Sequence, residues 1–173
     1  MGCRMSGQPF ELRPYQAEAI RAVIAAYRDG TSSALITLPT GAGKTVIFSE
    51  IARRIMPRRT LIIAHREELL AQAASKIGAV AGIVPGIEKG RMRSAPGDVV
   101  VAASVQTLAR GRKIPGDPFG LCVIDEAHHA PADSYGTVVA RFAPRYVLGV
   151  TATPYRNDTL KLSNVFEKNV YCA

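Results

Sequence analysis

Residues 38–45 read LPTGAGKT, a glycine-rich turn between an apolar run at 34–38 (ALITL) and a stretch with helical spacing at 46–56. Outward from this turn, the alternation of apolar runs and helical stretches continues. Apolar runs predict strands at 60–64 (TLIIA), 98–103 (DVVVAA), 121–124 (LCVI) and 146–150 (YVLGV), with a shorter one within 81–87, and residues 67–77 read as an amphipathic helix. Continuous apolar strands separated by helices are typical of a mainly parallel sheet covered on both faces. The pattern therefore predicts a single doubly wound α/β domain.

The glycine-rich turn itself predicts a phosphate-binding loop. Gly41 and Gly43 allow a tight turn whose N–H groups, with the N-terminus of the next helix, form an anion site. Lys44 adds a cation for the β- and γ-phosphates, and the Thr45 hydroxyl is a ligand for Mg²⁺. The strict motif has glycine where this chain has Leu38. An incidental glycine turn with a chance lysine is therefore the alternative.

Two carboxylates follow the predicted strand at 121–124, at the edge where ligands bind in open α/β sheets. Asp125 is suited to hold Mg²⁺ through water, and Glu126 to orient and deprotonate an attacking water. Glu126 and His129 also have the spacing of a di-iron ligand pair, but the sequence offers no second such pair. Acids that only cap the next helix are the other alternative.

The composition fits one domain with polyanionic partners. The chain has 173 residues, 47% of them hydrophobic, and no apolar run near the ~20 residues that span a bilayer. With no signal-like N-terminus, we expect a cytoplasmic protein and no membrane partner. Cys3, Cys122 and Cys172 form no metal- or redox-type pair, and Cys122 is expected in the core. The net charge of +8 favours nucleic acid as a partner, although a merely basic surface would carry the same charge.

Basic residues fall into two groups with different expectations. One group clusters at the end of the helix after the phosphate loop, where cations suit a helix C-terminus and a solvated face is expected: Arg53, Arg54, Arg58 and Arg59. The other group lies in and beside the loops at 88–97 and 111–120, and it comprises Arg91, Arg93, Arg110, Arg112 and Lys113. These side chains could approach phosphates, but nothing in the sequence orients them.

Several motifs together resemble superfamily 2 helicases of the DEAD/DEAH-box type. GAGKT (41–45), DEAH (125–128) and TATP (151–154) stand in the order and spacing of the N-terminal RecA-like domain of that superfamily. Three further segments resemble its other motifs: LRPYQ (12–16), AHREELLAQ (64–72) and SVQTL (104–108). Residues 149–158 (GVTATPYRND) resemble the form found in type III restriction subunits. The resemblance implies a P-loop NTPase domain that binds ATP and Mg²⁺.

The resemblance also implies roles for individual residues. Nucleotide binding falls to Arg13, Gln16, Thr40, Gly41, Ala42, Gly43, Lys44 and Thr45, with catalysis at Lys44, Asp125 and Glu126 and metal binding at Thr45 and Asp125. Coupling to the nucleic acid falls to His128, Thr151 and Thr153, and nucleic-acid contact to His65, Arg66, Ser104, Gln106 and Thr107. Three plain alternatives stay open: Gln16 as an exposed residue at a helix start, His128 as a satisfied histidine with no coupling role, and Ser104 as the cap of a helix at 105–109.

The domain limits and the function follow from these assignments. We expect an N-terminal tail at 1–10, a RecA-like ATP-binding domain at 11–158, and the start of a linker at 159–173 toward a second RecA-like domain absent from this chain. The first hypothesis is the ATP-binding motor domain of a helicase or translocase acting on nucleic acid, with DNA favoured over RNA. The second is a nucleotide-dependent nucleic-acid-binding module with little turnover of its own. An unrelated P-loop ATPase is a third.

Overall fold

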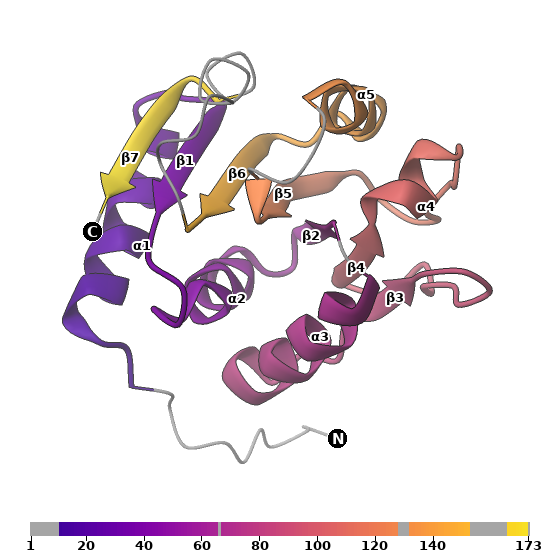
Figure 1. Ribbon diagram of the computed structural model, residues 1–173, viewed down its shortest axis with the longest axis horizontal. Helices are drawn as coiled ribbons and strands as arrows, with labels where there is room; N and C mark the ends of the chain where they lie inside the picture. Colours follow the sequence, from indigo (N-terminus) through magenta and orange to yellow (C-terminus); the bar gives the residue numbers. More distant parts are fainter. Residues whose placement is uncertain (1–10, 66, 128–131, 153–165, 173) are drawn as a thin grey trace.

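A computed structural model describes residues 11–65, 67–127, 132–152 and 166–172. Its centre is one seven-stranded sheet in which every pair of neighbours is parallel, with the strand order β3-β4-β2-β5-β6-β1-β7 (Figure 1). The strands are β1 (Ser33–Thr37), β2 (Arg59–Ala64), β3 (Gly86–Glu88), β4 (Val100–Ser104), β5 (Phe119–Asp125), β6 (Tyr146–Thr151) and β7 (Lys168–Cys172). The helices are α1 (Pro14–Arg28), α2 (Lys44–Ile55), α3 (Glu67–Ala81), α4 (Val105–Ala109) and α5 (Ala132–Phe142).

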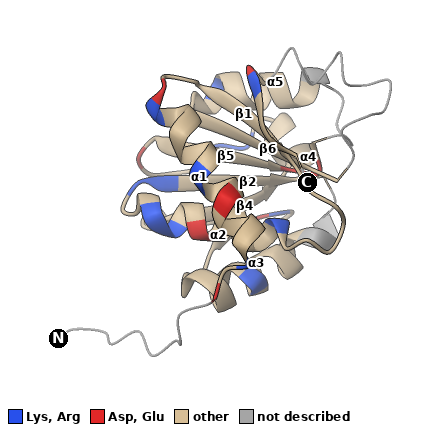
Figure 2. Cartoon of the chain, turned by 90° about the vertical axis from the view of Figure 1, so that its left-hand side faces the viewer, with Lys and Arg blue, Asp and Glu red and all other residues tan. Residues whose placement is uncertain are grey.

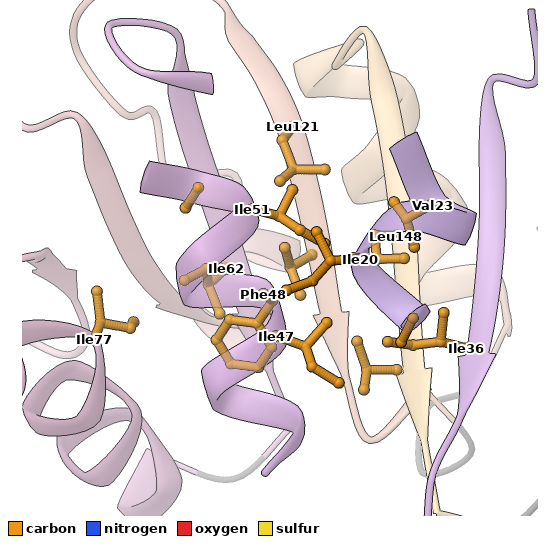
Figure 3. Packing of buried hydrophobic residues seen from close by; sticks show 14 of the residues in the cluster. Ile20, Val23, Ile36, Ile47, Phe48, Ile51, Ile62, Ile77, Leu121 and Leu148 are labelled. Atoms are coloured by element: carbon orange, nitrogen blue, oxygen red, sulfur yellow. The ribbon is translucent and has the colours of Figure 1, made fainter. Parts of the chain in front are cut away.

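Alternate residues of the central strands enter two separate cores, one on each face of the sheet. Ile36, Ile62 and Leu148 pack with side chains of α1, α2 and α3, as Figure 3 shows for Ile47, Phe48 and Ile51 of α2. The residues next to them in the strands form the second core with side chains of α4 and α5. These strand residues are Leu35, Leu61, Ile63 and Val147. Because both faces are covered, the strands read as continuous apolar runs. The doubly wound parallel fold predicted from the sequence is confirmed.

The predicted elements match the structure closely. Each of the five main strands lies within two residues of its predicted limits, and the helices predicted at 46–56 and 67–77 are α2 and α3. The segment 81–87 contributes less strand than expected, because α3 continues through Ala81 and β3 begins only at Gly86. Cys122 is a buried free thiol in the core, as expected, and burial raises its pKa to about 12.

The C-terminal segment contains the main departure from the sequence prediction. Residues 159–173 have no expected place in the core, yet Phe166 is buried and β7 pairs in parallel with β1 at the edge of the sheet. Phe166 fills the space above Gly149, where an added Cβ would collide with the ring. The segment is also tied to the residue before β1, since Glu167 accepts a hydrogen bond from the Ser32 backbone N–H at 3.1 Å. Residues 159–165 lie outside the described part of the chain.

One edge of the sheet collects the segments that follow all the strands. Because the strands are parallel, their carboxyl ends point the same way, and this carboxyl edge is where α/β domains bind ligands. Charged residues lie mainly on helices, loops and strand ends around an uncharged centre (Figure 2). No helix in the described part of the chain is both long and apolar enough to cross a membrane.

Candidate nucleotide-binding and nucleic-acid-facing site

The phosphate loop, residues 38–43, joins the carboxyl end of β1 to the first turn of α2. Gly41 and Gly43 have φ angles of 85° and 77°, which residues with a side chain rarely adopt. Gly43 is the N-cap of α2, and a Cβ there would lie 2.6 Å from Nε2 of Gln16. Leu38 stands where the strict motif has glycine; it is fully buried and its backbone N–H donates to the Thr151 carbonyl at 2.9 Å. The departure from the motif therefore anchors the loop in the core.

Lys44 and Glu126 meet across the carboxyl edge. The Lys44 ammonium lies 3.2 Å from a Glu126 carboxylate oxygen, although the two residues follow different strands, β1 and β5. The Lys44 side chain is 10% exposed, and that of Glu126 is 25% exposed. Glu126 has a φ of 52°, an unfavourable value for a residue with a side chain, and such strain tends to occur at functional sites. The geometry brings the predicted phosphate loop and the predicted acidic pair into one site.

Asp125 ends β5 beside this ion pair. Its carboxylate accepts a hydrogen bond from the Glu126 backbone N–H at 3.1 Å. Burial, with help from the neighbouring Glu126 carboxylate, raises the pKa of Asp125 to about 6, while the Lys44 ammonium opposes the shift. A carboxylate that is costly to ionise here is suited to a cation, because a bound cation would restore the charged form. Thr45 stands in the first turn of α2, on the phosphate-loop side of the same edge.

Thr151 lies between the predicted phosphate loop and the predicted acidic pair. It ends β6, which runs between β5 and β1, so that Val150 pairs with Asp125 and Thr151 pairs with Thr37. Thr151 is fully buried. A shift of its backbone would therefore be felt by both neighbouring strands. The other two residues expected to couple the sites, His128 and Thr153, lie outside the described residues.

Gln16 connects α1 to the phosphate loop. Its side chain is buried, so the alternative of an exposed glutamine at the helix start is wrong. Its Nε2 donates to the Ala42 carbonyl at 3.1 Å, and its Oε1 accepts from the Arg13 backbone N–H at 3.0 Å. Tyr15 was not anticipated: its hydroxyl also donates to the Ala42 carbonyl, at 2.8 Å. The signal for Tyr15 was its position beside Gln16 in LRPYQ.

The segments expected to contact nucleic acid lie on the other half of the carboxyl edge, after β2 and β4. Gln106 is exposed, and its Nε2 donates to the His65 carbonyl at 2.8 Å, so the two segments are joined. Ser104 is the N-cap of α4: its hydroxyl accepts from the Thr107 N–H at 3.2 Å and donates to the Thr107 hydroxyl at 2.7 Å. Of the two alternatives for Ser104, the structure therefore has the cap, with both hydroxyls buried. Arg66 lies outside the described residues.

Comparison with known proteins assigns the chain to a family. Residues 9–156 match the family model described as type III restriction enzyme, res subunit. The chain belongs to this family. It is a RecA-like domain of the superfamily 2 helicases.

Individual proteins similar to this type III restriction res family member support the assignment. The "Putative ATP-dependent helicase IRC3" of Saccharomyces cerevisiae is 36% identical over 92% of this chain and 26% of its own length. The DNA 3'-5' translocase XPB2 of Sulfurisphaera tokodaii is 38% identical over 86% of this chain and 32% of its own length. The chain thus spans about a quarter to a third of these relatives. A Sulfolobus solfataricus SWI2/SNF2 ATPase core in complex with dsDNA has the same fold, with a TM-score of 0.74, 19% identity, and coverage of 91% of this chain and 36% of that one.

One basic residue of this family member departs from the sequence expectation. Arg59 is only 6% exposed, whereas a solvated face was expected for it. Its Nε donates to the Asp98 carbonyl at 3.0 Å and its Nη1 to the Asp117 carbonyl at 2.7 Å, while the guanidinium stacks 4.6 Å from the centre of the Phe119 ring. The expectation is wrong for Arg59 because the residue begins β2 instead of ending a helix. Arg53, Arg54 and Arg58 are exposed as expected, and the first two pair with Glu50.

Proposed function

We propose that this domain binds Mg²⁺-ATP and couples its hydrolysis to movement along nucleic acid, as part of a longer helicase or translocase. The observation that carries the proposal is the 3.2 Å ion pair between Lys44 and Glu126. It brings a phosphate-binding lysine within reach of a carboxylate that can act on water. Thr151, buried between the two, supplies a route by which a change at the site reaches the neighbouring strands.

Each residue has a distinct task in this proposal. Lys44 leaves Glu126 for the β- and γ-phosphates when ATP binds, which frees the Glu126 carboxylate to orient and deprotonate the attacking water. The Thr45 hydroxyl and Asp125, the latter through water, would hold Mg²⁺. When bound, Mg²⁺ would supply positive charge against the charge that develops on the phosphate oxygens. The carboxyl of Asp125 is half-buried and its pKa is raised, so it fits a cation, and this fit supports the assignment.

Gln16 recognises the adenine in this proposal while it holds the phosphate loop. A glutamine amide has two N–H donors. One of them is engaged by the Ala42 carbonyl, which leaves the other for the base. Arg13, whose backbone N–H holds the Gln16 oxygen, stands beside it at the start of α1. Adenine bound to Gln16 would therefore act directly on the loop that binds the phosphates.

The partners of the longer protein are part of the same proposal. A second RecA-like domain closes on this carboxyl edge and supplies arginines to the transferring phosphoryl group, a contribution of about 10³ to 10⁵ in rate in other phosphoryl-transfer enzymes. The nucleic acid runs over the segments after β2 and β4, and we favour DNA because of the likeness to restriction subunits. The domain alone then binds nucleotide and hydrolyses it slowly.

Calorimetric titration of the chain with Mg²⁺-ADP and with a non-hydrolysable ATP analogue tests the nucleotide half. We expect Lys44→Ala to weaken both affinities by roughly 100-fold or more, because about two charge-assisted contacts at about 1.5–3 kcal/mol each are lost. Arg145→Gln is the matched control, because Arg145 is exposed and precedes β6 at the opposite edge of the sheet. Equal affinities for the three chains, or no binding by the folded unaltered chain, would contradict the proposal.

The second candidate is a binding module with little turnover, and the helicase and translocase relatives favour the motor over it. Joining the chain to a second RecA-like domain separates the two candidates. The motor predicts that nucleic acid then stimulates hydrolysis and that Glu126→Gln removes this stimulation. The binding module predicts nucleotide-dependent binding of nucleic acid without stimulated hydrolysis.

A further inference from the structure

Two loops at the β3 end of the carboxyl edge surround a basic pocket that none of the recognised motifs explains. The pocket has a volume of about 350 Å³. Its lining consists of Gly90, Arg93, Thr107, Arg110, Gly111, Arg112 and Lys113. Four of these seven residues carry a positive charge, and none carries a negative one. A hollow whose charged side chains are all cationic attracts anions.

A buried ion pair fixes the two loops to each other. Glu88 is fully buried, and it accepts hydrogen bonds from the Ser94 N–H at 2.9 Å and from Nη1 of Arg112 at 2.9 Å. The Arg112 guanidinium also donates to the carbonyls of Gly90 at 2.7 Å and Met92 at 3.3 Å. Burial tends to raise the pKa of Glu88, but the bonds from Ser94 and Arg112 hold it below its ordinary value. Arg112 thus clamps the loop after β3 against the loop after α4, and the pocket between them is preformed.

Three of the four cations remain available to a ligand. Arg112 is neutralised by Glu88, whereas Arg93, Arg110 and Lys113 are exposed and make no ion pair within the part of the chain that the structure describes. Arg53 and Arg54, by contrast, share the carboxylate of Glu50. Holding three like charges around one hollow is unfavourable in the free protein, and an anion would relieve it.

The pocket continues the half of the edge that carries the predicted nucleic-acid contacts. Thr107 belongs both to its lining and to the segment 104–108 after β4. Gln106 ties that segment to His65 after β2. Since β2, β4 and β3 are consecutive in the sheet, the segments that follow them form one row at the same edge. A chain of phosphates that crosses the first two segments reaches the pocket next.

We propose that this pocket binds a backbone phosphate of the nucleic acid. It extends the predicted nucleic-acid contacts after β2 and β4 to the β3 edge of the domain. The inference rests on the proposed function, because it assumes that nucleic acid lies on this edge. The lining has guanidinium and ammonium groups but no aromatic ring, so the contact positions the backbone without reading bases. Binding here is sensitive to salt and insensitive to sequence.

The test is the salt dependence of nucleic-acid binding by a triple variant, Arg93→Gln, Arg110→Gln and Lys113→Gln. Fluorescence anisotropy with a short DNA duplex, at several salt concentrations, gives the slope of log K against log [salt]. Each phosphate contact contributes about 0.9 to that slope for duplex DNA. We expect the magnitude of the slope to fall by about 1, the share of one phosphate, and the affinity at low salt to fall roughly tenfold or more.

A control triple variant, Arg21→Gln, Arg28→Gln and Arg145→Gln, removes the same three charges from exposed positions on α1 and before β6. We expect the control to lose less than about half of that slope, because only general attraction is reduced. Equal slopes for the two variants would contradict phosphate binding by the pocket while leaving the proposed function intact. No duplex binding by the unaltered chain that still binds Mg²⁺-ADP would contradict the nucleic-acid half of the proposed function and the pocket together.

A direct readout of the site completes the test. Titration of ¹⁵N-labelled chain with the same duplex should shift the amide signals of Gly90 and Gly111, which line the pocket. A polyglutamate peptide is the comparison ligand. If the peptide shifts these signals and the duplex does not, the pocket binds an acidic protein segment, and the proposal for nucleic acid is wrong.

Discussion

The carboxyl edge of the sheet has two halves that are built in different ways. The half formed by β1, β6 and β5 carries the phosphate loop, Thr151 and the acidic pair, all within a few residues of a buried strand end. The half formed by β2, β4 and β3 includes the loop after β3 and the loop after α4, which are joined by contacts such as that between Glu88 and Arg112. The parts of the first half are short sequence motifs at strand ends, whereas no motif marks the pair that joins the loops of the second half. Changes in each half should therefore have separable effects.

The largest effect is expected in the first half, from Glu126→Gln. The amide keeps the size of the side chain but cannot take a proton from water, and it releases Lys44 from its ion pair. We expect hydrolysis by the motor to fall about 10³-fold, within the usual range for loss of a positioned base, with nucleotide affinity kept or increased. Nucleic-acid affinity in the absence of nucleotide should not change. Single-turnover hydrolysis measures the rate, and fluorescence anisotropy with a DNA duplex measures the nucleic-acid affinity. A parallel loss of both would mean that the two halves do not act separately.

Sequence alone could predict the first half because each of its parts is a short motif next to an apolar strand. Gly43 illustrates why: the turn demands a positive φ and leaves no room for a Cβ beside Gln16, so the glycine is visible in the sequence. The strands themselves were predictable because both faces of a parallel sheet are covered.

The second half could not be predicted in the same way. Glu88 and Arg112 are 24 positions apart, and nothing local marks them as partners. Arg59 belongs to the same class, since its partners are the carbonyls of Asp98 and Asp117. Strand β7 was missed for a related reason. Its residues are exposed or half-buried at the sheet edge, so it lacks the apolar run that identifies the other strands.

An intermediate effect is expected in the second half, from Glu88→Gln. The change leaves the Arg112 guanidinium without its carboxylate, at a site where Glu88 is fully buried. We expect the free energy of unfolding to fall by about 2 to 4 kcal/mol at pH 7. Urea denaturation measures this loss. Affinity for Mg²⁺-ADP should be unchanged in the folded variant, because the first half does not depend on the pair.

The same pair predicts a pH dependence with a definite sign. The pKa of Glu88 is lowered in the folded chain relative to its ordinary value of 4.5. Its contribution is therefore complete above about pH 4.5 and is lost as the pH falls through the folded pKa. The difference in unfolding free energy between the unaltered chain and Glu88→Gln should shrink below that pH. Arg53 likewise lowers the pKa of Glu50. Because Glu50 is present in both proteins, its contribution cancels in the difference.

The smallest effect is expected from Gln106→Ala, at the junction within the second half. Gln106 is exposed, so its hydrogen bond to the His65 carbonyl contributes about 0.5 to 1.5 kcal/mol. Its loss loosens the segments after β2 and β4 relative to each other, and nucleic-acid affinity should fall roughly two- to tenfold with little change in the salt slope. That constant slope separates it from the pocket variants, which remove charge. A fall in slope as large as theirs would mean that Gln106 holds the basic loops themselves, and the second half would then be one cooperative unit extending from β2 to β3.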